Sequence, residues 1–245
     1  MEHILDLKDH EEFIKDNRWR SKAAVVVLLV SILISLVNLF IYWLQYDMLE
    51  SSDGTLFPEQ LASNRLRLQI ITPFELAISI TYWIFFIMWF RRAYCNLYRI
   101  GVPHLDSPEG LAAGAWFIPI YNLFKPFAMM REICDNTTYY VQKAAPSFLS
   151  PLPQKVIGWW WAVYVSSFLA SLSVVAFRPH SLKLSRQLLS TEYSMGLKLF
   201  EIASAILLIV VIRRLLPFEE EMKNRQVEIH AGFDVFGNVK GAQSK

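Results

Sequence analysis

Cysteine is scarce in this chain, whose 245 residues include only Cys95 and Cys134. The distribution of lysine and arginine, described below, places both cysteines on the cytoplasmic side of a membrane. Reduced thiols are therefore expected. Histidine is scarce as well, and none of the 5 histidines lies at a zinc-ligand spacing from another His, Cys, Asp or Glu. The sequence therefore predicts no metal site.

Motifs of the common enzyme classes are also missing. The chain has no Gly-rich phosphate loop, no Gly-x-Ser-x-Gly and no His-Glu-x-x-His. We therefore expect no cofactor and assign no catalytic residue. The net charge is only +2, and the basic residues are not clustered on one predicted helix face, which argues against nucleic acid as a partner.

A cleavable signal peptide is not apparent either. Residues 1–22 mix acidic and basic side chains and contain no apolar core. The first apolar run is therefore expected to insert into a membrane without cleavage.

Apolar residues, by contrast, make up 54% of the chain, with 8 Trp, 10 Tyr and 17 Phe. They concentrate in four runs that are long enough to cross a bilayer as helices, at about 1.5 Å per residue. These predicted spans cover residues 23–44, 70–90, 156–177 and 193–212. The sequence thus predicts an all-α integral membrane protein, with four transmembrane helices bundled within residues 23–215.

A further apolar stretch, at residues 110–130, is interrupted. Pro119 lies within it, and Lys125-Pro126 closes its uncharged part. A proline removes a backbone donor and clashes with the preceding helical turn. An uncharged run this short is more typical of a re-entrant or interfacial segment than of a full span. The sequence therefore predicts a proline-broken re-entrant or interfacial segment here.

Lysine and arginine decide between two topologies. If the broken segment returns to the side from which it entered, most of the 24 lysines and arginines fall on one side of the membrane, whereas they divide evenly if it crosses. Because cytoplasmic loops are enriched in positive charge, the returning topology is favoured. It places both termini in the cytoplasm, as a segment over residues 1–22 and a tail over residues 216–245.

Two clusters of residues resemble the signatures of a known family. The first reads Arg91-Arg92-Ala93-x-x-Asn96-Leu97. The second runs from Ser107-Pro108 through Trp116-Phe117-x-Pro119-x-x-Asn122-Leu123-x-Lys125-Pro126 to Met130-x-Glu132-Ile133. Together they resemble a bacterial membrane family catalogued as domain of unknown function 4328, and the resemblance covers residues 25–215. It implies a multi-span bacterial membrane protein and supplies no reaction. We expect the protein in the bacterial inner membrane.

The broken segment is the candidate binding site, and two interpretations of it stay open. In the structural interpretation, Asn122 satisfies a carbonyl group that a proline leaves free. In the functional interpretation, Trp116 forms an apolar wall, while Lys125 and Arg131 lie at headgroup depth and hold an anionic lipid or acidic ligand. The full candidate set comprises Trp116, Asn122, Lys125, Arg131, Glu132, Arg91 and Asn96.

We therefore expect a non-catalytic membrane module that binds or scaffolds, holding an anionic lipid or a partner helix at the broken segment. Its expected partners are membrane lipids, together with a membrane protein partner or further copies of the chain. Arg91, Arg92 and Arg99 are expected near the site, although snorkelling and topology also account for arginines there.

Two acidic residues within predicted spans, Glu75 and Glu201, support an alternative. Intramembrane carboxylates often serve ion or proton paths, so the alternative is a small channel or carrier. Lys198 lies one helical turn before Glu201 and offers a plainer explanation, as an ion-pair partner. A third alternative is an enzyme that acts on a lipid-linked substrate at the cytoplasmic face, with Glu132 as general base.

One packing expectation concerns the predicted span at residues 156–177. Small residues recur every four positions there, at Gly158, Ala162, Ser166 and Ala170. Such a stripe lets two helix backbones approach closely in lipid. The pattern predicts that this face packs against another helix.

Overall fold

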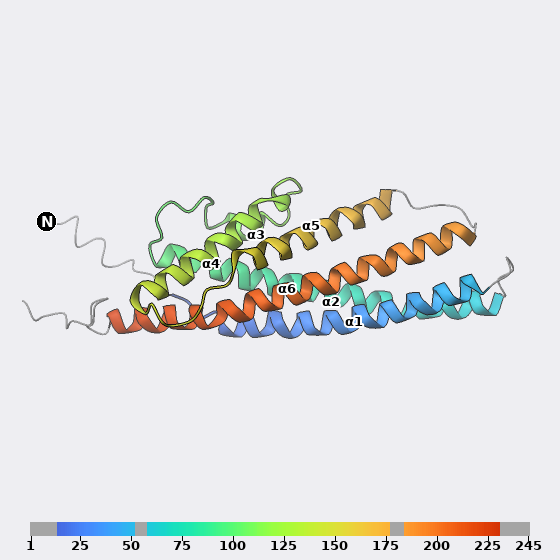
Figure 1. The fold of residues 1–245 in the computed structure, drawn as a ribbon, viewed down its shortest axis with the longest axis horizontal. Coiled ribbons are helices and arrows are strands. Elements are labelled where there is room, and N and C mark those ends of the chain that lie inside the picture. The colour runs from blue at the N-terminus through green and yellow to red at the C-terminus, as the bar shows by residue number, and fades with distance from the viewer. Residues whose placement is uncertain (1–13, 52–57, 177–183, 231–245) are drawn as a thin grey trace, which may run out of the picture. The chain divides into compact units, whose positions relative to one another are not determined.

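The computed structural model describes residues 14–51, 58–176 and 184–230. All regular structure within these residues is helical, which confirms the predicted all-α class. The long helices are α1 (Arg18–Glu50), α2 (Pro58–Arg99), α5 (Gln154–Ala176) and α6 (Leu184–His230), and α4 (Lys125–Ala144) is shorter (Figure 1). Residues 1–13 and 231–245 of the expected terminal segments lie outside the described residues.

Three of these helices are long and apolar enough to cross a membrane. The qualifying stretches are Arg18–Glu50, Ala62–Arg99 and Leu184–Arg225. They contain the predicted spans at 23–44, 70–90 and 193–212, and they indicate a membrane protein. α5 covers most of the predicted span at 156–177 as a helix but is not one of the three.

Two long helices pass through a proline without ending. Pro73 lies inside α2 and Pro217 lies inside α6. Membrane helices tolerate an internal proline when neighbouring groups satisfy the freed carbonyl. α6 continues well beyond the last predicted span, to His230, so that the first part of the expected tail is helical.

The end of α2 has a clear local cause. Gly101 has a positive φ of 70°, a backbone conformation that glycine adopts at little cost. Its amide donates to the carbonyl of Tyr98, and the amide of Val102 donates to that of Leu97. This is the Schellman arrangement, which satisfies the last carbonyls of a helix. It ends α2 directly after the Arg91–Leu97 signature.

The chain divides into two compact units. Unit 1 comprises residues 1–24, 85–157 and 211–245, and unit 2 comprises residues 25–84 and 158–210. Unit 1 thus contains the start of α1 and of α5, the end of α2 and of α6, and everything between α2 and α5.

The core of unit 1 is aromatic. Phe86, Trp89 and Phe90 of α2 are fully buried, and the Phe86 ring lies 6.0 Å from Trp89 and 5.9 Å from Phe90, between centroids. α4 adds Met129 and Met130, which are also fully buried. These side chains belong to the two family signatures or lie next to them.

Unit 2 is organised around aromatic side chains of α5. The Tyr164 ring lies 5.1 Å from Trp161, 6.4 Å from Phe168 and 6.2 Å from Trp83 of α2, between centroids. Trp160 is buried as well. Rings of this size contribute more buried area than small residues do.

This aromatic face explains why the small-residue stripe was predicted wrongly. Ala162 and Ser166 are exposed, whereas Trp160, Trp161 and Ser167 of the same helix are buried. The inward face of α5 is therefore the face with the large rings. The small-residue face and the aromatic face of α5 compete for the inward position, and the face that buries more area packs inward. The spacing of the small residues alone does not show which face that is.

Candidate functional site

The proline-broken segment consists of α3 (Leu111–Gly114), turns, the 3-10 helix η2 (Tyr121–Leu123) and the start of α4. Its backbone is bonded locally. The amide of Phe117 donates to the carbonyl of Gly114, that of Asn122 to Ile118, and that of Phe124 to Tyr121. Irregular backbone that is removed from water requires such partners, and these turns supply part of them.

Trp116 connects this segment to α2. The side chain is 6% exposed, and its ring packs edge-on against Phe86 at 5.0 Å and Phe90 at 5.4 Å. Asn122 is also buried. Trp116 is thus a packing residue whose ring already has protein partners.

The residues that follow Trp116 are turned outward. Phe117 is 74% exposed, Ile120 71% and Phe124 50%. We call this group the apolar tip, and it comprises Phe117, Ile118, Ile120, Tyr121, Leu123 and Phe124. Every member is a large apolar or aromatic side chain of the broken segment. Contact of this much apolar surface with water is unfavourable, at about 25 cal/mol per Å².

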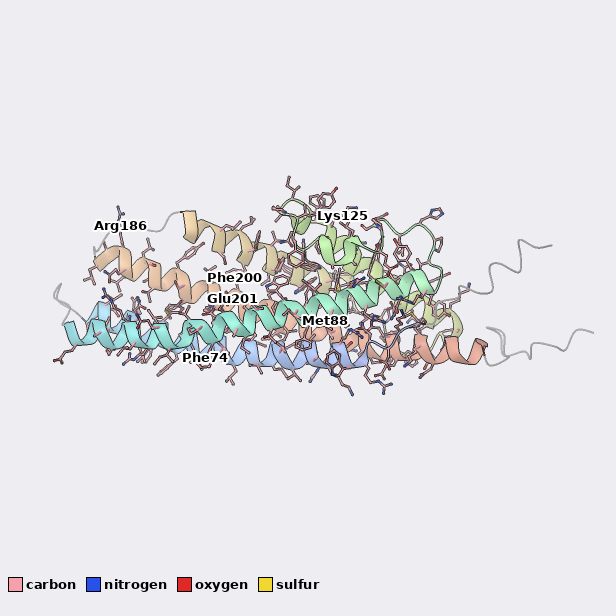
Figure 2. The ribbon with its side chains drawn as sticks, turned by 180° about the vertical axis from the view of Figure 1, so that it is seen from behind. Phe74, Met88, Lys125, Arg186, Phe200 and Glu201 are labelled. Atoms are coloured by element: carbon pink, nitrogen blue, oxygen red, sulfur yellow. The ribbon has the colours of Figure 1, made fainter. Side chains whose placement is uncertain are left out.

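Two cations on α4 follow the apolar tip in the chain. Lys125 is the first residue of α4 and is half-buried, as labelled in Figure 2. Arg131 is exposed, and its guanidinium carbon lies 5.9 Å from the centroid of the Phe127 ring. A cation over an aromatic ring is favourable, and the charge of Arg131 still faces outward.

Both carboxylate oxygens of Glu132 are within hydrogen-bonding distance of a protein donor. Tyr94 Oη lies 2.8 Å from Glu132 Oε2, and the Asp106 amide donates to Oε1 at 2.9 Å. Tyr94 Oη also lies 3.0 Å from the Ser107 carbonyl oxygen, which accepts from Tyr98 Oη as well. These bonds join α2, α4 and the Ser107-Pro108 turn. A carboxylate used in this way has a structural role, which weakens the general-base alternative.

Asn96 is engaged in the same manner. Its Oδ1 accepts from the Lys15 amide at 3.1 Å, and its Nδ2 donates to the Lys15 carbonyl at 2.9 Å. The side chain therefore pairs with the backbone of the segment before α1, as another peptide group would. Sequence separation hid this pairing, because the two residues are 81 positions apart.

Arg91 lies in a group of like charges. Arg92 interacts electrostatically with Arg20, Arg99 and Arg91, and each interaction is a repulsion between cations. The structure thus brings the three predicted arginines of α2 together and adds Arg20 of α1. The described contacts do not join this arginine group to Lys125 or Arg131.

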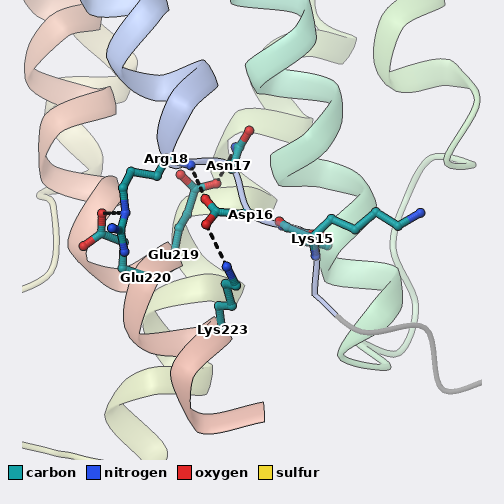
Figure 3. Close-up of a pocket in the computed structure, with 8 residues that line it drawn as sticks. Lys15, Asp16, Asn17, Arg18, Glu219, Glu220 and Lys223 are labelled. Carbon is teal, nitrogen blue, oxygen red and sulfur yellow. Dashed lines mark hydrogen bonds and ion pairs between the residues drawn. The ribbon is translucent and has the colours of Figure 1, made fainter. Parts of the chain in front are cut away.

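A small pocket lies where the segment before α1 meets α2 and α6 (Figure 3). Asp16 Oδ2 accepts from Lys223 at 2.7 Å, and Arg18 Nε pairs with Glu220 at 2.7 Å. The Lys223 ammonium, and next the Arg18 backbone amide, hold the pKa of Asp16 below its usual value. These ion pairs are well exposed, so each contributes little to stability.

Glu219 forms the buried base of this pocket. It is 6% exposed, and its carboxylate accepts from Asn17 Nδ2 at 2.7 Å and from Ser21 and Trp89 Nε1 at 3.4 Å. Sequence reasoning missed this group entirely. Its members are up to 202 positions apart. The only local signal for it in the sequence is the acidic run Glu219-Glu220-Glu221 near the start of the expected tail.

The two acids of the transport alternative meet in unit 2. Lys198 Nζ pairs with Glu75 of α2 and, at 2.8 Å, with Glu201 of α6. The Lys198 side chain is 9% exposed, while those of Glu75 and Glu201 are 33% and 40% exposed. The expected pairing of Lys198 with Glu201 therefore occurs, and Glu75 joins it.

Metal binding has no support in the described part of the chain, where no three His, Cys, Asp or Glu side chains gather. Cys95 and Cys134 are both buried, as free thiols. Burial raises the pKa of the Cys134 thiol well above its usual value. That thiol is therefore a poor nucleophile and ligand, because the thiolate is the reactive form.

Comparison with known proteins identifies one family. A model described as a domain of unknown function, number 4328, matches residues 52–216. No curated protein and no solved structure matches the chain. The matched range contains the broken segment, the arginines of α2 and the Lys198 cluster. It excludes Asn17 and Glu219.

Proposed function

We propose that this chain, which belongs to the family described as domain of unknown function 4328, is a non-catalytic membrane module that binds an anionic lipid. The binding element is the broken segment, with Lys125 and Arg131 at the headgroup. The membrane is a bacterial inner membrane, and the lipid is bound at its cytoplasmic face.

The apolar tip carries this proposal. Six large apolar side chains are exposed on one short segment, from Phe117 to Phe124. Lipid acyl chains are the solvent that makes such exposure favourable. Lys125 and Arg131 follow within two helical turns, which is where phosphate groups would lie if the tip enters the acyl region.

The proposed topology has α1, α2, α5 and α6 crossing the membrane, with the tip dipping in from the cytoplasmic side. Unit 1 gathers the start of α1, the end of α2, the start of α5 and the end of α6. If four helices cross the membrane and both termini lie on one side, these four helix ends lie on that same side. Unit 1 also contains most of the basic residues of the chain, which supports a cytoplasmic location for it.

Binding is tested by native mass spectrometry and lipid extraction of the purified protein. Lys125→Ala combined with Arg131→Ala is expected to release the copurifying anionic lipid. Each basic residue near an anionic surface contributes about 1 kcal/mol, so the double variant should bind the lipid roughly 30-fold more weakly. Lys143→Ala with Lys155→Ala is the matched control, because it removes the same charge from α4 and α5.

Retention of the lipid by the Lys125/Arg131 variant would overturn the proposal. Ion flux in liposomes that Glu75→Gln or Glu201→Gln abolishes would instead favour the channel or carrier. Saturable turnover of a lipid-linked substrate that depends on Glu132 would favour the enzyme. Folding of each variant is checked by its thermal unfolding in the same detergent.

A further inference from the structure

Glu219 lies beneath the short segment that precedes α1, and we propose that it acts as a pH-dependent latch for this segment. The segment comprises residues 14–17, and we call it the N-terminal hook. The hook is closed on unit 1 while the Glu219 carboxyl group carries a proton, and it is released when that proton leaves. The proposal does not rest on the lipid site, because Lys125 and Arg131 take no part in it.

The N-terminal hook is attached to three helices of unit 1. Lys15 exchanges two hydrogen bonds with Asn96 of α2 through its backbone. Asn17 Nδ2 donates both to a backbone carbonyl of α2 and to Glu219 of α6. The first residue of the hook, Ile14, is 5% exposed and belongs to an apolar cluster of α4 and α6 whose other members are Val141, Phe218 and Met222.

The hook covers the Glu219 carboxyl group with uncharged donors. Asn17 Nδ2 lies 2.7 Å from Oε1, and Ser21 Oγ and Trp89 Nε1 each lie 3.4 Å from Oε2. None of these three groups carries a charge. Burial in such surroundings disfavours the ionised form of a carboxyl group, because hydrogen bonds from neutral donors replace only part of its hydration.

The charged groups next to Glu219 on the hook, α1 and α6 are paired with one another. Asp16 Oδ2 accepts from Lys223 at 2.7 Å, and Arg18 Nε pairs with Glu220 at 2.7 Å (Figure 3). Each pair is neutral as a whole, and Asp16 adds a repulsion between like charges to Glu219. These pairs therefore leave the charge of an ionised Glu219 uncompensated.

The other neighbours of Glu219 do not compensate its charge either. Lys15 is exposed, and Figure 3 shows its side chain directed away from Glu219. From α4, Cys134 is close enough to interact electrostatically with Glu219, and burial raises the pKa of this thiol so far that it stays neutral. From α2, Trp89 and Asn96 contribute uncharged side chains.

The direction of the pH dependence follows from this burial. Glu219 lies about two helical turns beyond the predicted span at 193–212, after the exposed Arg213 and Arg214. Burial raises the pKa of its carboxyl group from 4.5 to about 7, although the three hydrogen bonds lower it. Closure of the hook is therefore favoured fully below pH 4.5 and is weakened as the pH rises through about 7, when the proton passes to water. The pKa of Asp16 lies below its usual value, so its ion pair does not titrate in this range.

Hydrogen exchange of the Lys15 amide, measured by mass spectrometry of the full chain in detergent micelles, tests the latch. This amide donates to Asn96 in the closed hook. After correction for the intrinsic exchange rate, protection of the wild type should fall about tenfold between pH 6 and pH 8. Glu219→Gln is neutral and similar in shape, so its protection should be the same at both pH values. Glu220→Gln is the matched control, because it removes the same charge from the adjacent position and should keep the tenfold change.

Three outcomes would overturn the latch. Constant wild-type protection between pH 6 and pH 8 would mean that the hook does not respond to a proton. A pH dependence that persists in Glu219→Gln would assign the response to another group. Low protection of Glu219→Gln at both pH values, at an unchanged melting temperature, would show that the ionised carboxylate holds the hook. The wild-type melting temperature, which needs no variant, should also fall from pH 6 to pH 8, and a rise would contradict the proposed direction.

Discussion

At the scale of single residues, several polar side chains that the sequence singled out are engaged with protein partners. Asn96 pairs with the Lys15 backbone, Glu132 with Tyr94 and the Asp106 amide, and Lys198 with two acids. Buried polar groups are costly unless they are bonded. The sequence shows these polar residues within apolar runs. It does not show their partners, because those are set by the packing of distant segments.

Tyr94→Phe tests the bonds that hold the Ser107-Pro108 turn. The variant keeps the ring in the core but removes the hydroxyl that lies within bonding distance of Glu132 and Ser107. The Ser107 carbonyl keeps Tyr98 Oη as a donor, whereas Glu132 Oε2 loses its contact with Tyr94. Leaving a partly buried acceptor without its donor costs about 1–3 kcal/mol. We therefore expect a lower melting temperature in detergent.

Tyr139→Phe is the control for this prediction, because Tyr139 of α4 is 67% exposed. Its melting temperature should stay at the wild-type value. Equal stability of Tyr94→Phe and the wild type would mean that the Glu132 cluster contributes nothing to the fold.

At the scale of elements, the broken segment combines two opposite surfaces. Trp116 packs into the aromatic core of unit 1, and the next residue, Phe117, points outward. The sequence predicted the interruption at Pro119 and treated Trp116 as a wall of the binding site. The structure makes Trp116 a core residue, packed against Phe86 and Phe90, and assigns the outer surface to the apolar tip.

Trp116→Ala and Phe117→Ala separate these two roles. Removing a buried Trp side chain costs about 3–5 kcal/mol, so Trp116→Ala should melt at a clearly lower temperature in detergent. Phe117→Ala should leave the melting temperature unchanged and weaken lipid retention, because its ring is exposed. If the two variants melt alike, the buried contacts of Trp116 do not support the fold.

At the scale of the whole molecule, the proposed function depends on the membrane topology. Labelling of the native cysteines is a poor test of it, because Cys95 is 5% exposed and Cys134 is 4% exposed. Neither thiol would react readily from either side of the membrane. Cysteines introduced at exposed positions are therefore required.

Glu109→Cys, Tyr139→Cys and Ser185→Cys, each in a chain with Cys95 and Cys134 replaced by serine, test the returning topology. All three positions are exposed. A membrane-impermeant maleimide applied to intact cells should label Ser185→Cys alone, because the proposed topology places Glu109 and Tyr139, on either side of the broken segment, in the cytoplasm. Labelling of Tyr139→Cys without Glu109→Cys would show that the segment crosses the membrane.

Local patterns in the sequence were sufficient to predict the helical class, the membrane-compatible runs, the break at Pro119 and the family. Each of these follows from local properties: the length of apolar runs, backbone restriction by proline, and residue motifs at fixed spacing. These signals need no knowledge of which segments meet. For the same reason, the overlap of three predicted spans with helices Arg18–Glu50, Ala62–Arg99 and Leu184–Arg225 was within reach of the sequence.

The orientation of side chains toward the core and the pairing of polar groups depend on how distant segments pack. Asn17 and Glu219 are 202 positions apart, and Glu75 and Lys198 are 123 apart. Such pairs form because packing brings their helices together, and no local pattern encodes that proximity. The outward face of α5 illustrates the same limit: a periodic stripe of small residues predicted a packed face, and the larger buried area of Trp160 and Trp161 determined the opposite orientation.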